Sequence, residues 1–285
     1  MVKEHISKIP PRKENTHKGD FGHVFVLGAS RGMTGAAYLA SQAAIRSGSG
    51  LVTCGIPESL SSIMEVKLTE VMTLALPETK IGSLSLSAEK EIVGFSGKAD
   101  VLALGCGLSG HKETQRLVRN LLKKVKAPVV LDADGINALA GHGEILKKRK
   151  FHTVLTPHAE EMARLLEVNI RVVQRSREKV ALDFAKKHNA ILVLKGHRSV
   201  VVSPKGHKYV NKTGNSGMST AGTGDVLTGM ISSFVGQGID PYSAAVIGVY
   251  LHGLAGDIAA KERGQFSMIA GDLLEKLPLA IQEVL

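Results

Sequence analysis

The chain has 285 residues, of which 44% are hydrophobic and 22% charged, which is ordinary for a globular protein. The net charge of +10 suits scattered surface charge or an anionic substrate, whereas an aromatic content of 4% without Trp disfavours a nucleic-acid-binding surface. The sequence shows no signal peptide, no apolar run expected to span a membrane, and no disulfide framework from its two cysteines, so we expect a cytoplasmic protein.

Short apolar runs alternate with helical patterns after a polar segment, residues 1–16, that we expect to be a tail. Strands are predicted at 23–28, 51–56, 71–76, 101–105, 129–132, 154–156, 191–195, 199–202 and 207–210. Helices are predicted at 36–46, 88–95, 112–124, 158–166, 172–188, from 225 to about 235, 240–261 and 273–285. This alternation predicts a single α/β domain over residues 1–285, with a mostly parallel sheet covered on both faces.

The most informative stretch is 213–238, where a loop rich in Gly, Ser and Thr leads into an apolar helix. The first N–H groups of a helix have no internal partner and attract anions. Gly222 and Gly224 leave this helix start open to a phosphate, and Asp225 in the first turn would repel a resting one. We interpret Asp225 as a general base that activates a hydroxyl for attack on a phosphoryl group, with helix capping as the alternative.

Polar or small residues also follow several of the other strands. Asp132 and Asp134 can hold Mg²⁺ through water, although Asp134 can instead cap a helix. His158 begins a helix and can donate to a substrate oxygen. Lys195 begins a turn, residues 195–199, that suits phosphate or is a solvated β-turn. His252 on the long helix is expected to be packed or on the surface rather than a ligand.

These strings together resemble the ADP/ATP-dependent NAD(P)H-hydrate dehydratases of the ribokinase-like superfamily, over residues 17–275. The strings are NSGMSTAGTGDVLTGMI around Asp225, LDADGINAL around Asp132, TPHAEE at 156–161, KGHRS at 195–199 and HKGDFGH at 17–23. The glycine loop at 28–37 and the turn at 105–108 also match. Thr34 and Cys106 depart from the pattern, because this family usually has proline at both positions.

The resemblance implies a three-layer α/β/α ribokinase-like fold and a hydro-lyase for metabolite repair. Such an enzyme uses ADP or ATP to convert (6S)-NAD(P)HX, the hydrated form of NADH or NADPH, back to NAD(P)H, with release of phosphate. It implies that Asp225 takes the hydroxyl proton and that Gly222–Gly224 hold the phosphoryl group. The hydrated cofactor would contact Ala37, Gly107, His158 and Asp225, and the nucleotide would contact Lys195, Gly196, His197, Arg198, Ser199 and Gly224.

Further expectations from the resemblance are Mg²⁺ as the cofactor and a homotetramer, with no nucleic-acid or membrane partner. Many bacterial relatives carry an epimerase domain in front of this one; these residues do not include it, so a separate protein would supply that activity. Two other functions stay open. A small-molecule kinase of the same superfamily, acting on a vitamin precursor or sugar, would leave phosphate on its product. A nucleotide-binding module without turnover would not need Asp225.

Overall fold

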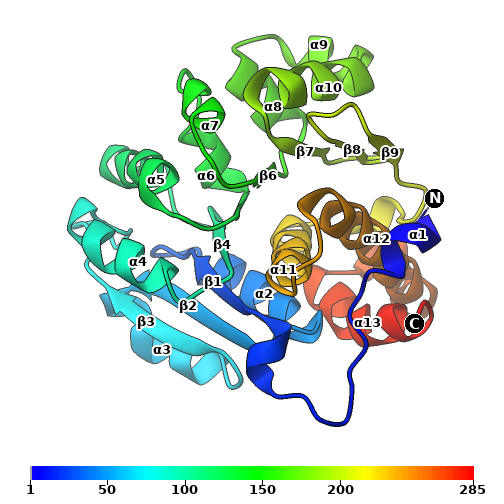
Figure 1. Ribbon diagram of the computed structural model, residues 1–285, viewed down its shortest axis with the longest axis horizontal. Helices are drawn as coiled ribbons and strands as arrows, with labels where there is room; N and C mark the ends of the chain where they lie inside the picture. The colour runs from blue at the N-terminus through cyan, green and yellow to red at the C-terminus, as the bar shows by residue number, and fades with distance from the viewer. Residues whose placement is uncertain (1) are drawn as a thin grey trace.

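The computed structural model describes residues 2–285 and has a nine-stranded sheet at its centre (Figure 1). The strand order is β3-β2-β1-β4-β5-β6-β7-β8-β9, in which β1 to β7 are parallel and β8 and β9 are antiparallel. The strands are β1 His23–Leu27, β2 Leu51–Pro57, β3 Met72–Leu76, β4 Val101–Leu104, β5 Val129–Leu131, β6 Thr153–Leu155, β7 Ile191–Leu194, β8 Val200–Val202 and β9 Lys208–Val210.

Helices connect the parallel strands and complete the chain. They are α1 Val2–Ile6, α2 Thr34–Arg46, α3 Ser61–Lys67, α4 Glu89–Ser96, α5 Lys112–Lys124, α6 Ala133–Asn137, α7 Glu144–Lys147, α8 Ala159–Leu166, α9 Ile170–Arg175, α10 Arg177–His188, α11 Thr223–Gly236, α12 Pro241–Ser267 and α13 Ala270–Gln282. Short 3₁₀ turns occupy Lys18–Phe21, Glu58–Leu60, Leu86–Ala88 and Ser216–Met218.

The two faces of the sheet carry separate apolar cores, because successive side chains of a strand point to opposite faces. In β1, Val24 and Val26 pack in one core with residues of α2, α11, α12 and α13. Phe25 and Leu27 of the same strand pack in the other core with α4, α5, α8 and α10. The three-layer α/β/α arrangement predicted from the sequence is therefore confirmed, and Figure 1 shows the sheet between its two helical layers.

All nine predicted strands are confirmed to within one residue at each end. The single helix predicted at 172–188 is wrong, because Ser176 adopts φ −138° and ψ 42° and divides it into α9 and α10. Helix α12 continues to Ser267, beyond the predicted end at about 261, although its backbone is broken at Gly264 (φ 73°). The last helix is α13, which begins three residues earlier than predicted. The short helices α3, α6 and α7 were not predicted.

The segment 1–16 is not a free tail throughout, although residue 1 lies outside the described residues. Helix α1 packs on α12, where His5 Nδ1 lies 2.8 Å from Ser243 Oγ. Lys8 Nζ donates to Asp240 Oδ2 at 2.7 Å and to Ser243 Oγ at 2.8 Å. These contacts fold the start of the chain onto the N-terminus of α12.

Helix α12 also corrects the expectation that no apolar segment is long enough to cross a membrane. Its 27 residues pass that test by length and composition alone. However, 72% of its most apolar window is buried inside the protein, where it packs against α11 and α13. The helix is therefore part of the protein core.

Candidate functional site

The candidate site lies at the carboxyl edge of the parallel strands, where the loops after β1, β4, β5, β6 and β7 meet the start of α11. Ligands of open α/β sheets bind at this edge. The loops after β1 and β4 are joined by hydrogen bonds from Ala29 N to Cys106 O (3.0 Å) and from Ser30 Oγ to Gly107 O (2.9 Å). Ala37, on α2, is fully buried beneath the first of these loops.

The start of α11 depends on glycine at two positions. Gly222 is the N-cap residue at φ 92°, and a Cβ there would lie 2.5 Å from Leu39 Cδ1. A Cβ on Gly224 would lie 3.2 Å from Lys195 Nζ and 3.8 Å from Asp132 Oδ2. Gly224 thus keeps the first turn of α11 open toward a lysine and a carboxylate, as an anion site at a helix N-terminus requires, whereas Gly222 is required by its positive φ and its close packing on Leu39.

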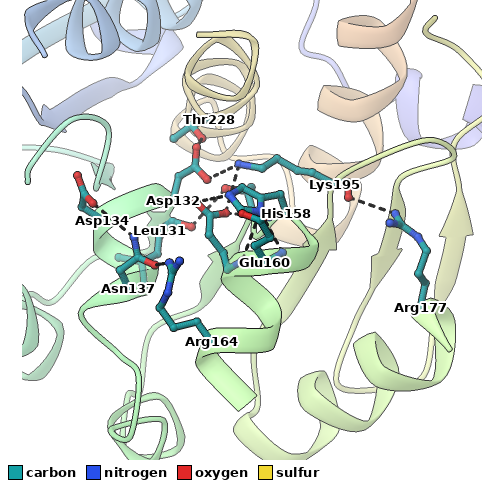
Figure 2. A network of polar contacts seen from close by, with 12 residues as sticks. Leu131, Asp132, Asp134, Asn137, His158, Glu160, Arg164, Arg177, Lys195 and Thr228 are labelled. Atoms are coloured by element: carbon teal, nitrogen blue, oxygen red, sulfur yellow. Dashed lines mark hydrogen bonds and ion pairs between the residues drawn. The ribbon is translucent and has the colours of Figure 1, made fainter. Parts of the chain in front are cut away.

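Charged side chains from four elements converge near this helix start, and Figure 2 shows Lys195 directed at Asp132. Lys195 Nζ lies 2.6 Å from Asp132 Oδ1 and 3.9 Å from Glu161 Oε2. Thr228 Oγ1, one turn into α11, donates to Asp132 Oδ2 at 2.8 Å. We call Asp132, Glu161, Lys195 and Asp225 the charged cluster. Asp132 and Glu161 are buried, with 1% and 6% of their surface exposed, so each carboxylate depends on Lys195 and neighbouring donors for its stability.

Burial, and after it the negative charge of Asp132, raises the pKa of Asp225 from 3.8 to about 6. Burial likewise raises the pKa of Glu161. For Lys195, burial lowers the pKa, but the charges of Asp132 and Glu161 outweigh burial and leave it raised. The charged cluster therefore contains the ammonium group of Lys195 and the carboxylate of Asp225. The basicity of Asp225 is higher than usual, as a general base near neutral pH requires.

Cys106 lies beside Asp225, at one of the two positions where proline was expected. Its Sγ and carboxylate oxygens of Asp132 and Asp225 lie within 4.8 Å of one another. Burial raises the pKa of this thiol well above its usual value, and the charges of Asp225 and Asp132 raise it further, so the thiol stays protonated. Thr34, at the other such position, is the first residue of α2, where the proline that it replaces would also fit.

The predicted pairing of Asp132 with Asp134 is not formed. Asp134 points away from Asp132 in Figure 2. Its Oδ2 accepts from Ser109 N at 2.8 Å, and its Oδ1 lies 3.4 Å from Asn137 Nδ2. It does not cap α6 either, because Asp132 occupies the N-cap position. The partner of Asp132 across the site is Asp225, whose position in the sequence is 93 residues later.

The arrangement of Asp132 and Asp225 fits a Mg²⁺ ion held through water. Mg²⁺ takes oxygen ligands and usually keeps several waters besides one or two carboxylates and phosphate oxygens. Asp132 Oδ1 already accepts from Lys195 and Asp132 Oδ2 from Thr228, so Asp225 has more oxygen lone pairs left for a metal-bound water.

His158 is the N-cap residue of α8, and its ring nitrogen Nδ1 accepts hydrogen bonds from the helix backbone. Its Nδ1 accepts from the backbone N–H groups of Glu160 (3.1 Å) and Glu161 (3.3 Å). A neutral ring that accepts at Nδ1 carries its proton on Nε2. Nε2 lies 3.4 Å from Glu161 Oε1, and 48% of the side chain is exposed. His158 is therefore fixed as an Nε2–H donor beside Glu161, and its half-exposed ring lines an adjoining cavity.

A cavity of about 830 Å³ opens beside the charged cluster, and we call it the nucleotide cavity after the predicted nucleotide contacts in its lining. Its lining includes all five residues of the predicted 195–199 turn together with His158 and Gly224. The turn is braced from behind by Arg177, whose Nη2 donates to Leu194 O (2.9 Å) and Lys195 O (3.2 Å). The opposite wall is the loop 211–220, in which Asn215 Nδ2 donates to Gly256 O (2.9 Å) and Asp257 Oδ1 (3.0 Å).

His252 closes the floor of this cavity and joins it to α11. Its Nε2 lies 2.8 Å from Thr223 O, and because a carbonyl only accepts, the ring nitrogen donates. Burial lowers the pKa of His252 to about 4, so the ring is neutral at ordinary pH. It is packed, as predicted, and it also holds the first residue of the anion-site helix.

Sequence reasoning missed four residues of the site: Thr228, Arg177, Cys106 as a neighbour of Asp225, and Glu161 as a member of the charged cluster. Arg177 carries no local signal, because its side chain contacts backbone 17 and 18 residues away in the sequence. Glu161 was noted only as part of a motif. Thr228 could have been identified as a polar residue within the apolar helix pattern that follows Asp225.

Comparison with known sequences matches this chain to the NAD(P)H-hydrate dehydratase family over residues 24–279. The bifunctional NAD(P)H-hydrate repair enzyme Nnr of Moorella thermoacetica is 47% identical over 278 residues, which cover 98% of this chain and 52% of that protein. The ADP-dependent (S)-NAD(P)H-hydrate dehydratase of Neisseria meningitidis is 35% identical, with 92% of this chain and 86% of that protein covered. The chain thus spans about half the length of its bifunctional relatives.

Solved structures agree with the sequence comparison. The ADP/ATP-dependent NAD(P)H-hydrate dehydratase of Bacillus subtilis, co-crystallised with ATP and Mg²⁺, superposes with a TM-score of 0.85 at 29% identity and covers 100% of this chain and 98% of that one. A ribokinase-like superfamily protein of Enterococcus faecalis superposes with a TM-score of 0.83 at 25% identity and covers 100% of this chain and 95% of that one. The fold is therefore ribokinase-like.

Proposed function

This chain belongs to the NAD(P)H-hydrate dehydratase family, and we propose that it uses ADP or ATP to dehydrate (6S)-NAD(P)HX to NAD(P)H. The observation that carries the proposal is the position of Asp225, a carboxylate with a pKa of about 6 in the first turn of α11, beside the nucleotide cavity. Such a base serves phosphoryl transfer to a hydroxyl group better than it serves binding of an anion that stays intact.

In the proposed mechanism, Asp225 removes the proton from the ring hydroxyl of the hydrated cofactor. The hydroxyl oxygen attacks the terminal phosphoryl group of the nucleotide, and the bond from phosphorus to the leaving AMP or ADP breaks. The ring nitrogen lone pair then expels phosphate from the ring carbon, and loss of a proton from the adjacent carbon restores the dihydropyridine. His158 Nε2–H is in a position to donate to the cofactor, which supports its assignment as a substrate contact.

The transferring phosphoryl group would lie on the N–H groups of Gly222–Gly224. Lys195 approaches the same point, because its Nζ would be 3.2 Å from a Cβ on Gly224. A pre-positioned ammonium group and helix N–H groups stabilise charge that develops on the phosphoryl oxygens. Lys195 and the 196–199 turn would contact the nucleotide, while Ala37, Gly107, His158 and Asp225 would contact the hydrated cofactor.

Four further expectations are part of this proposal. Mg²⁺ bound through water at Asp132 and Asp225 would neutralise phosphate charge. Residues 1–285 would form one domain, which the family match over 24–279 supports. The active form would be a homotetramer in the cytoplasm. Its partners would be the substrate and the nucleotide, without nucleic acid or membrane.

The proposal is tested by incubating the protein with NADHX and Mg²⁺ plus ADP, ATP or no nucleotide. We expect absorbance at the NADH band to appear with an adenine nucleotide only, together with one free phosphate for each NADH. Free phosphate distinguishes this reaction from that of a kinase of the same fold, which would leave phosphate on the organic product. Nucleotide binding without NADH formation or phosphate release would instead indicate a module without turnover.

A further inference from the structure

A second cavity, of about 750 Å³, lies near the charged cluster but is separate from the nucleotide cavity. We call it the cationic cavity. In Figure 2, Asn137 and Arg164 from its wall lie to one side of Asp132 and His158, whereas Lys195 and Arg177 lie to the other. Its polar lining consists of Lys112, Gln115, Arg119, Asn137, His142 and Arg164.

The lining carries three permanent positive charges. Lys112 and Arg119 come from α5 and Arg164 comes from α8, and among the described residues that line the cavity none is acidic. Each arginine is fixed through one nitrogen: Arg119 Nη1 donates to Ala138 O at 3.0 Å, and Arg164 Nη1 donates to Asn137 Oδ1. The remaining guanidinium nitrogens are available to a ligand. Fixed guanidinium groups with amide donors beside them suit a phosphate.

The cationic cavity is joined to the reaction centre by short segments of chain. Helix α6 begins directly after Asp132 and ends at Asn137, so about 7–8 Å of helix separates the two residues. The β4–α5 loop runs from Cys106, beside Asp225, to Gly110 in the cavity wall. Asp134 ties these two segments together by accepting from Ser109 N at 2.8 Å.

We propose that the cationic cavity binds a phosphate group of the hydrated dinucleotide substrate, an inference that rests on the proposed function. Two phosphorylated ligands must meet at Asp225, and the nucleotide cavity is assigned to ADP or ATP. The part of the substrate beyond its reacting ring must therefore leave the centre in another direction. NADHX offers the two phosphates of its pyrophosphate, and NADPHX offers a third on the adenosine ribose.

The test is a double variant, Lys112→Gln with Arg164→Gln, assayed with NADHX and with NADPHX. Both side chains are exposed, so the fold is expected to survive, and the melting temperature checks this. The matched control is Arg171→Gln with Lys179→Gln, which removes the same charge from exposed positions outside the cavity. We expect KM for the substrate to rise about tenfold or more in the cavity variant, as for one lost charge-assisted hydrogen bond. The value of kcat and the nucleotide Kd should stay within about threefold of those of the wild-type protein.

The two substrates separate the possible phosphates. A rise in KM with NADPHX alone assigns the cavity to the ribose phosphate, and a rise with both substrates assigns it to the pyrophosphate; either result supports the inference. An active wild-type protein with unchanged KM in the cavity variant overturns the inference and leaves the proposed function standing. An equal rise in the control variant also overturns it. A wild-type protein that converts neither substrate overturns the proposed function, and this inference with it.

Discussion

The charged cluster and the nucleotide cavity are neighbours at one edge of the sheet, but they are constructed differently. The cluster joins side chains that are far apart in the sequence: Asp132 bonds to Lys195 and Thr228, which are 63 and 96 residues away. The cavity is lined largely by two segments, 195–199 and 211–224, in which glycine, hydroxyl groups and backbone predominate. Its contacts include short-range ones such as Thr223 Oγ1 to Thr220 O at 3.0 Å.

This difference separates binding from chemistry in the proposed enzyme. Apart from Lys195, which belongs to both, the cavity can bind a nucleotide through backbone, neutral donors and the side chains of Arg198 and Lys212, whereas the buried cluster of charges changes the pKa values of its members. Substitutions in the cluster should therefore alter catalysis and stability more than nucleotide affinity. Substitutions in the cavity wall should do the reverse.

The largest effect is expected for Asp225→Asn, which removes the proposed base and keeps the size of the side chain. We expect kcat with NADHX to fall by about 10²–10⁴-fold, the usual contribution of general-base catalysis. The Kd of ADP, measured by calorimetry, should be unchanged or slightly lower, because a negative charge near phosphate is lost. A kcat within about threefold of the wild-type value would show that Asp225 is only a capping residue.

Asp132→Ala should be strongly destabilising. It leaves the partly buried Lys195 without its nearest carboxylate, and breaking a buried ion pair costs about 3–5 kcal/mol in the free energy of unfolding. The matched control is Asp134→Ala, two residues further on, which removes a carboxylate that accepts from one backbone N–H and costs about 1 kcal/mol. Urea denaturation measures both values. Equal losses for the two variants would contradict the central position given to Asp132.

Asp225 should also make the protein less stable as the pH rises. Its pKa is raised from 3.8 to about 6 on folding, so the folded state binds this proton more tightly than the unfolded state. The free energy of unfolding therefore falls as the pH rises from about 4 to about 6. The difference corresponds to about 3 kcal/mol. Asp225→Asn should therefore be more stable than the wild-type protein at pH 8, by up to that amount, and equally stable near pH 3.5. Melting curves at both pH values test this, and a variant that is less stable at pH 8 would refute it.

The smallest effect concerns the nucleotide cavity. Millimolar ADP or ATP should raise the free energy of unfolding by about 2.7 kcal/mol at a hundredfold excess over Kd, and by the same amount in Asp225→Asn. GTP serves as the comparison nucleotide. A stabilisation that disappears in Asp225→Asn would show that the charged cluster and the cavity do not act separately.

The sequence predicts the cavity side of the site better than the cluster side, for a physical reason. Glycine turns and helix starts are local patterns, so the opening at Gly224 and the 195–199 turn can be predicted without a structure. The cluster depends on which strands become neighbours, and nothing local distinguishes Asp132 from Asp134. Both follow the same strand, yet one faces Lys195 and the other faces Ser109.

The same reasoning explains the errors in the fold. Helices α3, α6 and α7 have four to seven residues, too few for a helical period to be recognised. No glycine or proline marks the break between α9 and α10 at Ser176. The contacts of the first residues, such as Lys8 with Asp240, join positions 232 residues apart. The parallel sheet itself was predicted because its strands are continuous apolar runs.

The most direct test of the account is the pH dependence of kcat/KM with NADHX and ADP in the wild-type protein and in Asp132→Asn. This quantity reports pKa values of the free enzyme. We expect the wild-type value to fall below pH about 6, as Asp225 becomes protonated. Removing the charge of Asp132 should move this decline to lower pH. Titration of the substrates is common to both proteins, so the difference between the two curves belongs to the enzyme. Curves that decline at the same pH, or a wild-type value that is constant through pH 6, would contradict the assignment of Asp225 as the base that Asp132 tunes.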